Sequence, residues 1–185
     1  MTNIVAVGDS YVAGYGVDAD ASWVARLEEK LDRPIVNLGE NGAWITELSK
    51  RAYPLEAGDV LLVLGGCNDL LGDASVDRVL EAYDAFRDMA DARGARCMIL
   101  LPPMPDIVGD ELFVGMLMIE SLKEKMKELY RRADGYPLDC AIRRDKPMFL
   151  DGIHLIEEGH AQVAEAVYRW GMRDGIFLNI VDATP

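Results

Sequence analysis

Histidine is scarce in this chain of 185 residues, which has only His154 and His160. There are three cysteines, Cys67, Cys97 and Cys140, with no CxxC spacing. Zinc sites built from cysteine and histidine need closely spaced ligands, so we expect no such site and no other metal or cofactor. An odd number of dispersed cysteines is typical of reduced thiols, which indicates a reducing compartment.

Positive charge and long apolar runs are also in short supply. The formal net charge is -13, and no run of basic residues is longer than two, as at Arg143-Arg144. Nucleic acids and anionic membrane surfaces are bound by clustered lysine and arginine, so neither is an expected partner. No apolar run approaches the ~20 residues of a membrane span. The first apolar run begins within a few residues of Met1, with no visible signal peptide, so a cytoplasmic location is predicted.

Short apolar runs rich in Val, Ile and Leu alternate with helix-period segments. The runs cover residues 4–7, 35–38, 60–64 and 97–101, and a fifth strand is predicted near 136–140. Such runs are typical of parallel strands that are buried on both faces. The alternation predicts one α/β domain over 1–185, with a doubly wound parallel sheet of about five strands and helices on both faces.

The helical segments are marked by apolar stripes of period 3.6. They lie around residues 23–31, 45–48, 76–90, 118–133 and 163–171. The apolar tail 176–181 is open to two interpretations, a short extra strand or a cover for another surface. The stretch 102–115 has three prolines and no clear period, which predicts a long loop. We hypothesise that this loop and the helix after it wall the acyl side of a substrate site. The alternative is that the loop only packs on its own helix.

The first predicted strand is followed by Gly8, Asp9 and Ser10, which could form a simple turn or present a catalytic serine. These residue types are typical of turns. They also place a lone serine at the carboxyl end of a strand. If the strand order is the flavodoxin-like 2-1-3-4-5, ligands bind between strands 1 and 3, where the order reverses. The segments 37–42 and 65–69 would then leave the sheet at the same edge as Ser10.

A serine hydroxyl is a poor nucleophile without a base. His154 is the predicted base, because Asp151 precedes it by three residues and can orient its imidazole. His160, at the start of the last predicted helix, stays open as an alternative. Three candidate donors for an oxyanion are the backbone N–H of Ser10, the backbone of Gly42 and the side-chain amide of Asn68.

These segments together resemble the SGNH hydrolases of the GDSL esterase/lipase superfamily. The matching blocks are the GDS of residues 8–10, Gly42 within NLGENGA, the GxND of residues 66–69 and the DxxH of residues 151–154. The resemblance implies a three-layer α/β/α fold and hydrolysis of esters or thioesters. The chain departs from the family pattern at Tyr11, where Leu or Ile is common. It also carries Cys67 inside the third block and Trp44 shortly after Gly42.

The predicted function is that of a serine hydrolase that cleaves a small-molecule carboxylic ester or thioester through an acyl-enzyme on Ser10. One alternative is an acyltransferase that uses the same site, with an acceptor hydroxyl in place of water. The other is a non-catalytic binding module, since fold alone does not define function. The apolar tail 175–181 leaves a homodimer open.

Several further side chains have a structural and a chemical interpretation. Asp9 is predicted to bind backbone in its turn, with a second catalytic carboxylate as the alternative. Cys67 is predicted to be a buried spectator and Trp23 a core residue. Three methionines, Met104, Met116 and Met118, either line an acyl pocket or pack in the core.

Overall fold

A five-stranded parallel sheet in the order β2-β1-β3-β4-β5 forms the centre of the molecule. The computed structural model describes residues 2–106 and 113–181, with the backbone alone at 113–118, 179 and 181. The strands are β1 (Ile4–Gly8), β2 (Ile35–Gly39), β3 (Val60–Leu64), β4 (Arg96–Leu101) and β5 (Tyr136–Pro137). All neighbouring strands pair in parallel, which confirms the predicted order and the switch point between β1 and β3.

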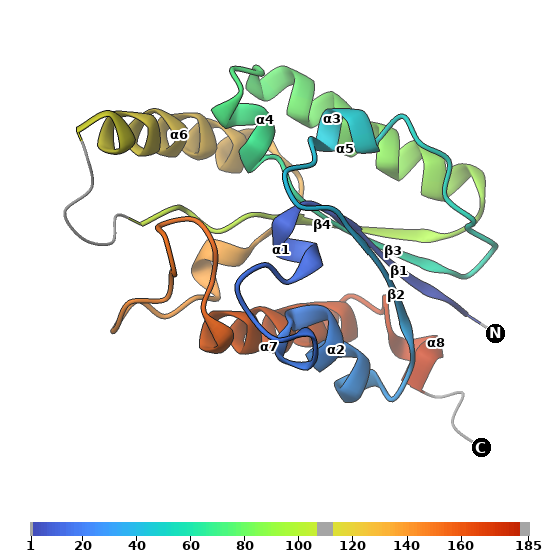
Figure 1. The fold of residues 1–185 in the computed structure, drawn as a ribbon. Helices are drawn as coiled ribbons and strands as arrows, with labels where there is room; N and C mark the ends of the chain where they lie inside the picture. The colour runs from blue at the N-terminus through green and yellow to red at the C-terminus, as the bar shows by residue number, and fades with distance from the viewer. Residues whose placement is uncertain (1, 107–112, 182–185) are drawn as a thin grey trace.

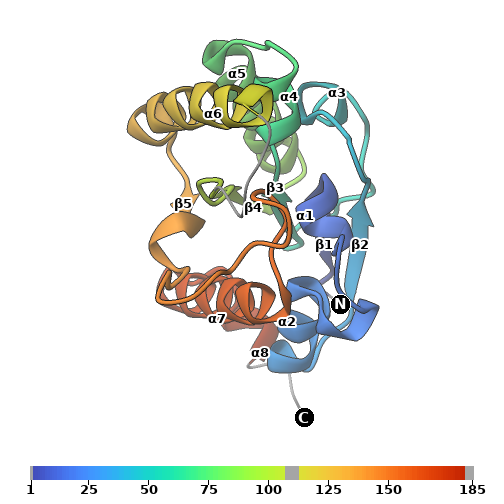
Figure 2. The same ribbon diagram turned by 60° about the vertical axis from the view of Figure 1, so that its left-hand side comes forward.

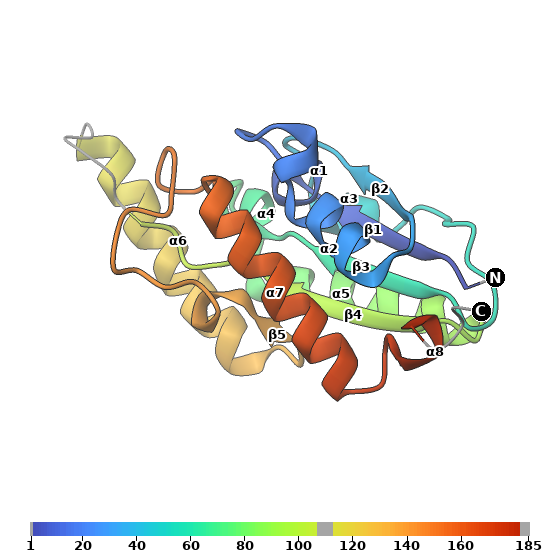
Figure 3. The same ribbon diagram turned by 90° about the horizontal axis from the view of Figure 1, so that it is seen from below.

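Helices cover both faces of this sheet, so the fold is the three-layer α/β/α arrangement (Figure 1). One face carries α3 (Ile45–Leu48), α4 (Cys67–Leu71), α5 (Val76–Ala92) and α6 (Phe113–Arg132). The other carries α2 (Trp23–Leu31) and α7 (Glu157–Arg173), which lie side by side beneath the strands (Figures 2 and 3). The short elements are α1 (Ser10–Ala13), η1 (Ala19–Ala21), η2 (Leu138–Cys140) and α8 (Leu178–Val181).

The core lies where apolar strands meet the two helical layers. Every residue of β1 and β3 is buried, as predicted for central parallel strands. The prediction was wrong for β2, where only Ile35 is buried and Val36 is 50% exposed. Because β2 is an edge strand, the helices do not cover it fully, although its apolar run reads like that of a central strand.

Two further predictions need correction. The fifth strand is only Tyr136–Pro137, and the chain continues as the 3-10 turn η2. Proline has no backbone N–H to extend a ladder, which accounts for the early end. The tail is the helix α8 rather than a strand, and Phe177 before it is fully buried against Gly171. The long loop also ends earlier than expected, because α6 begins at Phe113.

Close packing at the carboxyl edge of the sheet depends on Gly39 at the end of β2. A Cβ atom there would lie 2.1 Å from the backbone nitrogen of Ala13 in α1. Glycine therefore lets α1 pack directly over the end of β2 and keeps it beside the switch point.

Among the helices of the described ranges, none is both long enough and apolar enough to cross a membrane.

Candidate active site

Ser10 lies at the switch point of the sheet, directly after β1. Asp9 caps the one-turn helix α1, since its Oδ1 accepts a hydrogen bond from the Tyr11 backbone N–H at 3.0 Å. Ser10 is the first residue of this helix, and Gly14 ends it in the left-handed conformation at φ 79°. The caps at both ends define a tight turn that carries Ser10, a residue that is 7% exposed.

The structure brings the two halves of the predicted site together. The Nε2 atom of His154 lies 2.9 Å from the Ser10 Oγ, and its Nδ1 lies 2.6 Å from the Asp151 Oδ2. The other Asp151 oxygen, Oδ1, accepts the backbone N–H groups of His154 at 2.8 Å and of Ile153 at 3.1 Å. The carboxylate therefore fixes both the ring of His154 and the turn that carries it.

These contacts also determine the charge of Asp151. Partial burial by itself would raise the pKa of this carboxyl. The backbone N–H and the ring of His154, together with the Ile153 N–H, outweigh that effect and hold the Asp151 pKa below its usual value. Asp151 is therefore ionised at neutral pH and faces the imidazole as an anion.

The loop that carries Asp151 and His154 is closed at its base. Phe149 and Leu155 form an antiparallel bridge. The Leu150 N–H donates to the His154 carbonyl at 2.7 Å, and the Asp106 N–H donates to the Gly152 carbonyl at 2.8 Å. The loop is thus attached both to itself and to the segment that leaves β4.

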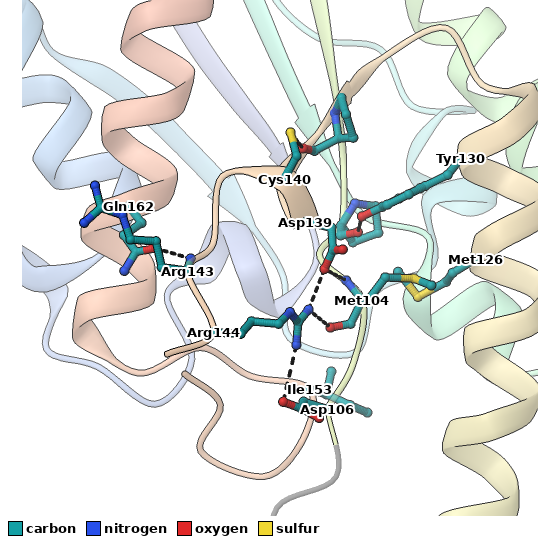
Figure 4. A network of polar contacts seen from close by, with 12 residues as sticks. Met104, Asp106, Met126, Tyr130, Asp139, Cys140, Arg143, Arg144, Ile153 and Gln162 are labelled. Carbon is teal, nitrogen blue, oxygen red and sulfur yellow. Dashed lines mark hydrogen bonds and ion pairs between the residues drawn. The ribbon is translucent and has the colours of Figure 1, made fainter. Parts of the chain in front are cut away.

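Arg144 contacts the segment 102–106 that follows β4, which we call the β4 exit segment (Figure 4). Its guanidinium donates to the Met104 carbonyl at 2.6 Å and to Asp139 at 2.5 Å, and it forms an ion pair with Asp106 at 3.4 Å. The same guanidinium lies 5.1 Å from the ring centroid of Phe149. A planar fork of five donors can serve several acceptors at once, which a lysine ammonium does not match.

The predicted oxyanion donors come from the same sheet edge. Gly42 lies in the turn after β2 at φ 76°, a conformation that favours glycine. The Asn68 side-chain amide, from α4 after β3, donates to the Ala43 carbonyl at 3.0 Å. One of the two Asn68 N–H groups therefore holds the Gly42 loop, and the other stays available to a ligand.

His160, the alternative base, lies away from Ser10. It is 1% exposed, and its Nδ1 accepts the Trp23 backbone N–H at 3.2 Å. Burial, with smaller effects of Arg26 and His154, lowers the pKa of His160 to about 4. Its ring is a neutral packing element at the start of α7.

Most of the other side chains for which the sequence allowed a chemical role have a structural role instead. Trp23 is 1% exposed and donates through Nε1 to the Tyr11 carbonyl at 2.8 Å. Cys67 is buried, and burial raises the pKa of its thiol far above the usual range, so it is an unreactive thiol at neutral pH. Met104 is half-buried against the core. The side chains of Met116 and Met118, and residues 107–112 of the predicted pocket wall, lie outside the described residues.

Asp9 binds the backbone of its turn, as predicted. Its burial is not predicted from the sequence, and burying a carboxylate is unfavourable. The side chain is 1% exposed, and among the described residues its Oδ2 has no hydrogen-bond partner. Burial, and to a smaller extent the nearby charge of Asp69, raises the pKa of Asp9 to about 7. The Asp9 carboxyl therefore keeps its proton in the folded state at pH values where an unfolded chain releases it.

This shift predicts a pH-dependent stability. The free energy of unfolding should fall as pH rises from about 4 to about 7, because only the unfolded chain ionises Asp9 freely in that range. Asp9→Asn should remove this fall, worth about 1.4 kcal/mol per pKa unit as an upper bound. Urea unfolding of both proteins at pH 5 and pH 8 checks it, and the difference between them cancels the opposite contribution of His160. Equal differences at both pH values would contradict the assignment.

Two aromatic residues near the site, Tyr11 and Tyr15, make contacts that the sequence does not predict. The Tyr11 hydroxyl donates to the Ile153 carbonyl at 2.7 Å, across 142 positions of the chain. The ring of Tyr15, 47% exposed, lies 4.3 Å from the ring of His154 between centroids. In the sequence, Tyr11 stands out only as a departure from the family pattern, and Tyr15 follows Gly14 without any periodic pattern.

Within the described ranges, no group of three or more His, Cys, Asp or Glu residues is placed to hold a metal ion.

A serine, a histidine and an aspartate in mutual contact, at the carboxyl edge of a doubly wound sheet, is the arrangement of a serine hydrolase. The model of the GDSL-like Lipase/Acylhydrolase family matches residues 6–162. The chain belongs to this family and is a serine ester hydrolase. The comparison with curated proteins finds no match.

Several solved structures share the fold. An aryl esterase of M. smegmatis, in an inhibitor-bound form, has a TM-score of 0.70 at 15% identity and covers 94% of this chain and 99% of its own. A putative lipolytic protein of the G-D-S-L family from Desulfitobacterium hafniense has a TM-score of 0.69 at 19% identity, covering 91% and 99%. A carbohydrate acetylesterase from Sinorhizobium meliloti has a TM-score of 0.65 at 14% identity, covering 94% and 99%. At these identities the likeness concerns the fold.

Proposed function

We propose that the protein hydrolyses carboxylic esters, and thioesters of the same acyl groups, through an acyl-enzyme on Ser10. The observation that carries this proposal is the continuous contact from the Ser10 Oγ through the His154 ring to Asp151, at 2.9 and 2.6 Å. A hydroxyl within hydrogen-bonding distance of an oriented imidazole is the requirement for an activated serine nucleophile.

In the acylation step, the Ser10 Oγ attacks the acyl carbon while its proton passes to Nε2 of His154. Asp151 stabilises the imidazolium that results. When the bond to the leaving oxygen or sulfur breaks, Nε2–H returns the proton to the leaving group. Water then attacks the acyl-enzyme, His154 takes its proton, and the Ser10 Oγ leaves with a proton from the same nitrogen.

The charge that develops on the acyl oxygen needs hydrogen-bond donors. Ser10 is the first residue of α1, so its backbone N–H has no acceptor within the helix. The Gly42 N–H and the second N–H of Asn68 complete the proposed set of donors. Each such donor is typically worth about 10²–10³ in rate.

The substrate side is proposed to be apolar. Three exposed large apolar side chains come from segments at the carboxyl edge of the sheet and from the loop that carries His154: Tyr15, Trp44 and Leu150. Leu150 lies against Gly16, and Trp44 against Gly72. Exposed apolar surface beside a polar site favours an acyl or aryl group as the ligand.

The test is a hydrolysis panel of nitrophenyl esters from acetyl to long acyl chains, together with acyl-thioesters. We expect hydrolysis of at least one ester, with no added cofactor and with loss of nearly all activity in Ser10→Ala. Adding an alcohol to the panel detects acyl transfer, since a transferase would form the new ester in preference to the free acid. The panel run on Met104→Ala shows whether the β4 exit segment affects chain-length preference. No hydrolysis by the folded protein over the whole panel would contradict the proposal.

Tyr15 should contribute to turnover through its contact with the His154 ring. An aromatic face stabilises a neighbouring cation, and such contacts are worth about 0.5–1.5 kcal/mol. Tyr15→Ala is expected to lower kcat by about 3- to 10-fold, and Tyr15→Phe to keep most of the activity. The matched control is Trp44→Ala, which removes another exposed ring, from the segment after β2, and should affect KM more than kcat. Unchanged kcat in Tyr15→Ala would contradict this role.

Three broader properties are part of the same proposal. The five strands belong to one sheet, which supports a single domain over 1–185. The free, dispersed cysteines support a reducing compartment, so we place the protein in the cytoplasm. A homodimer stays a prediction for measurement of mass in solution.

A further inference from the structure

The hydroxyl of Tyr11 joins two segments that must meet for the proposed chemistry. Tyr11 directly follows Ser10 and is 2% exposed. Its hydroxyl donates to the carbonyl of Ile153, which directly precedes His154, at 2.7 Å. The bond therefore connects the neighbour of the proposed nucleophile to the neighbour of the proposed base.

The backbone of Tyr11 is itself held firmly. Its N–H donates to the Asp9 Oδ1 at 3.0 Å, and its carbonyl accepts Nε1 of the buried Trp23 at 2.8 Å. A side chain that starts from a fixed backbone, and that is surrounded by core residues, has little freedom to move its hydroxyl. The Ile153 carbonyl is thus held at a defined distance from α1.

The environment of the hydroxyl keeps it a donor. Burial raises the pKa of Tyr11 well above its usual value, and the neighbouring Cys67 raises it further. The proton is therefore present over the whole working pH range. The bond is part-buried, and the Ile153 carbonyl would lose its only side-chain donor among the described residues if the hydroxyl were removed.

Few other polar contacts connect these two segments. Among the described residues, residues 9–14 and 149–155 are joined by two polar side-chain contacts, from Ser10 to His154 and from Tyr11 to Ile153. The remaining anchors of the loop lead elsewhere, to its own base and to Asp106. The Tyr11 bond is thus the polar contact that can set the distance from Ser10 to His154 without taking part in the proton transfer.

We propose that Tyr11 is a positioning residue, whose hydroxyl holds the Asp151–His154 loop against the Ser10 turn through the Ile153 carbonyl. The proposal rests on the proposed function, because it assigns the alignment of His154 with Ser10. It also gives a role to a position where the family pattern commonly has an aliphatic residue that cannot donate a hydrogen bond.

The test is Tyr11→Phe, which removes only the hydroxyl. We expect kcat on the best nitrophenyl ester to fall by about 10-fold, because small misplacements of a catalytic group are costly. KM should change by less than about 3-fold, since the hydroxyl does not touch the substrate side. The rate at which an active-serine phosphonate labels Ser10 should fall by the same factor as kcat.

Tyr53→Phe is the matched control. The Tyr53 hydroxyl is also buried and donates to a backbone carbonyl, that of Leu48, at 3.0 Å. It should lose a similar amount of stability in urea and keep both kcat and the labelling rate.

The proposal is overturned if Tyr11→Phe keeps the wild-type kcat, if it changes only KM, or if it unfolds where Tyr53→Phe stays folded. Ser10→Ala, measured in parallel, distinguishes failure of the positioning role from failure of the proposed function. Hydrolysis by Ser10→Ala at a rate near that of the wild type would overturn the proposed function itself. A dead Ser10→Ala with a fully active Tyr11→Phe would overturn only the positioning role.

Discussion

Ser10→Ala should reduce kcat for ester hydrolysis by a factor on the order of 10⁵–10⁶, to the level of binding and oxyanion stabilisation alone. The physical reason is the loss of the nucleophile in a site whose other groups act only through it. The fold should survive, since the Ser10 hydroxyl contacts His154 and is not part of a core network. Steady-state kinetics with a nitrophenyl ester and a thermal melt check both parts.

Ser75→Ala is a suitable control for this experiment. Ser75 caps α5, and its hydroxyl accepts the Arg78 backbone N–H at 3.4 Å. The helix α5 belongs to one of the two helical layers that cover the sheet (Figure 1). Its loss should cost about 1 kcal/mol of stability with unchanged kcat. An active Ser10→Ala protein, free of wild-type contamination, would contradict the assignment of the nucleophile.

Asp151→Asn is expected to lower kcat by about 10³–10⁴ with little change in stability. The geometry gives the reason. Two backbone N–H groups bind Oδ1, so the variant must keep its oxygen on that side and turn its amide nitrogen toward Nδ1 of His154. An N–H donor facing Nδ1 favours the tautomer that carries its proton on Nε2. That ring cannot accept the proton of Ser10.

The control for this variant is His160→Gln, which removes the other histidine of the chain. Because His160 is buried and binds the Trp23 N–H, its loss should affect stability and leave kcat nearly unchanged. The opposite pattern, with normal turnover in Asp151→Asn and none in His160→Gln, would show that the wrong histidine has been assigned as the base.

The sheet order and the location of the site could be predicted from sequence for a physical reason. Parallel strands that are buried on both faces leave continuous apolar runs, and their carboxyl ends meet at one edge. The spacing of Asp151 and His154 fits one turn of chain, so their contact is local. The approach of His154 to Ser10 follows once both are assigned to that edge.

Other features depend on packing that the sequence does not record. The run at β2 reads like a central strand, but coverage by helices depends on the position of the strand in the sheet. The tail 176–181 has no period that separates a strand from a helical turn. The contact of the Tyr11 hydroxyl with Ile153 joins residues 142 positions apart, and nothing in either local pattern indicates it.

The most direct test of the account is covalent labelling with an active-serine phosphonate, followed by peptide mapping with mass spectrometry. The account predicts one phosphonyl group for each chain, on the peptide that carries Ser10, and a loss of hydrolysis in proportion to labelling. Ser10→Ala should remain unlabelled under the same conditions. A phosphonyl group on any other residue, or full hydrolysis by a completely labelled protein, would contradict it.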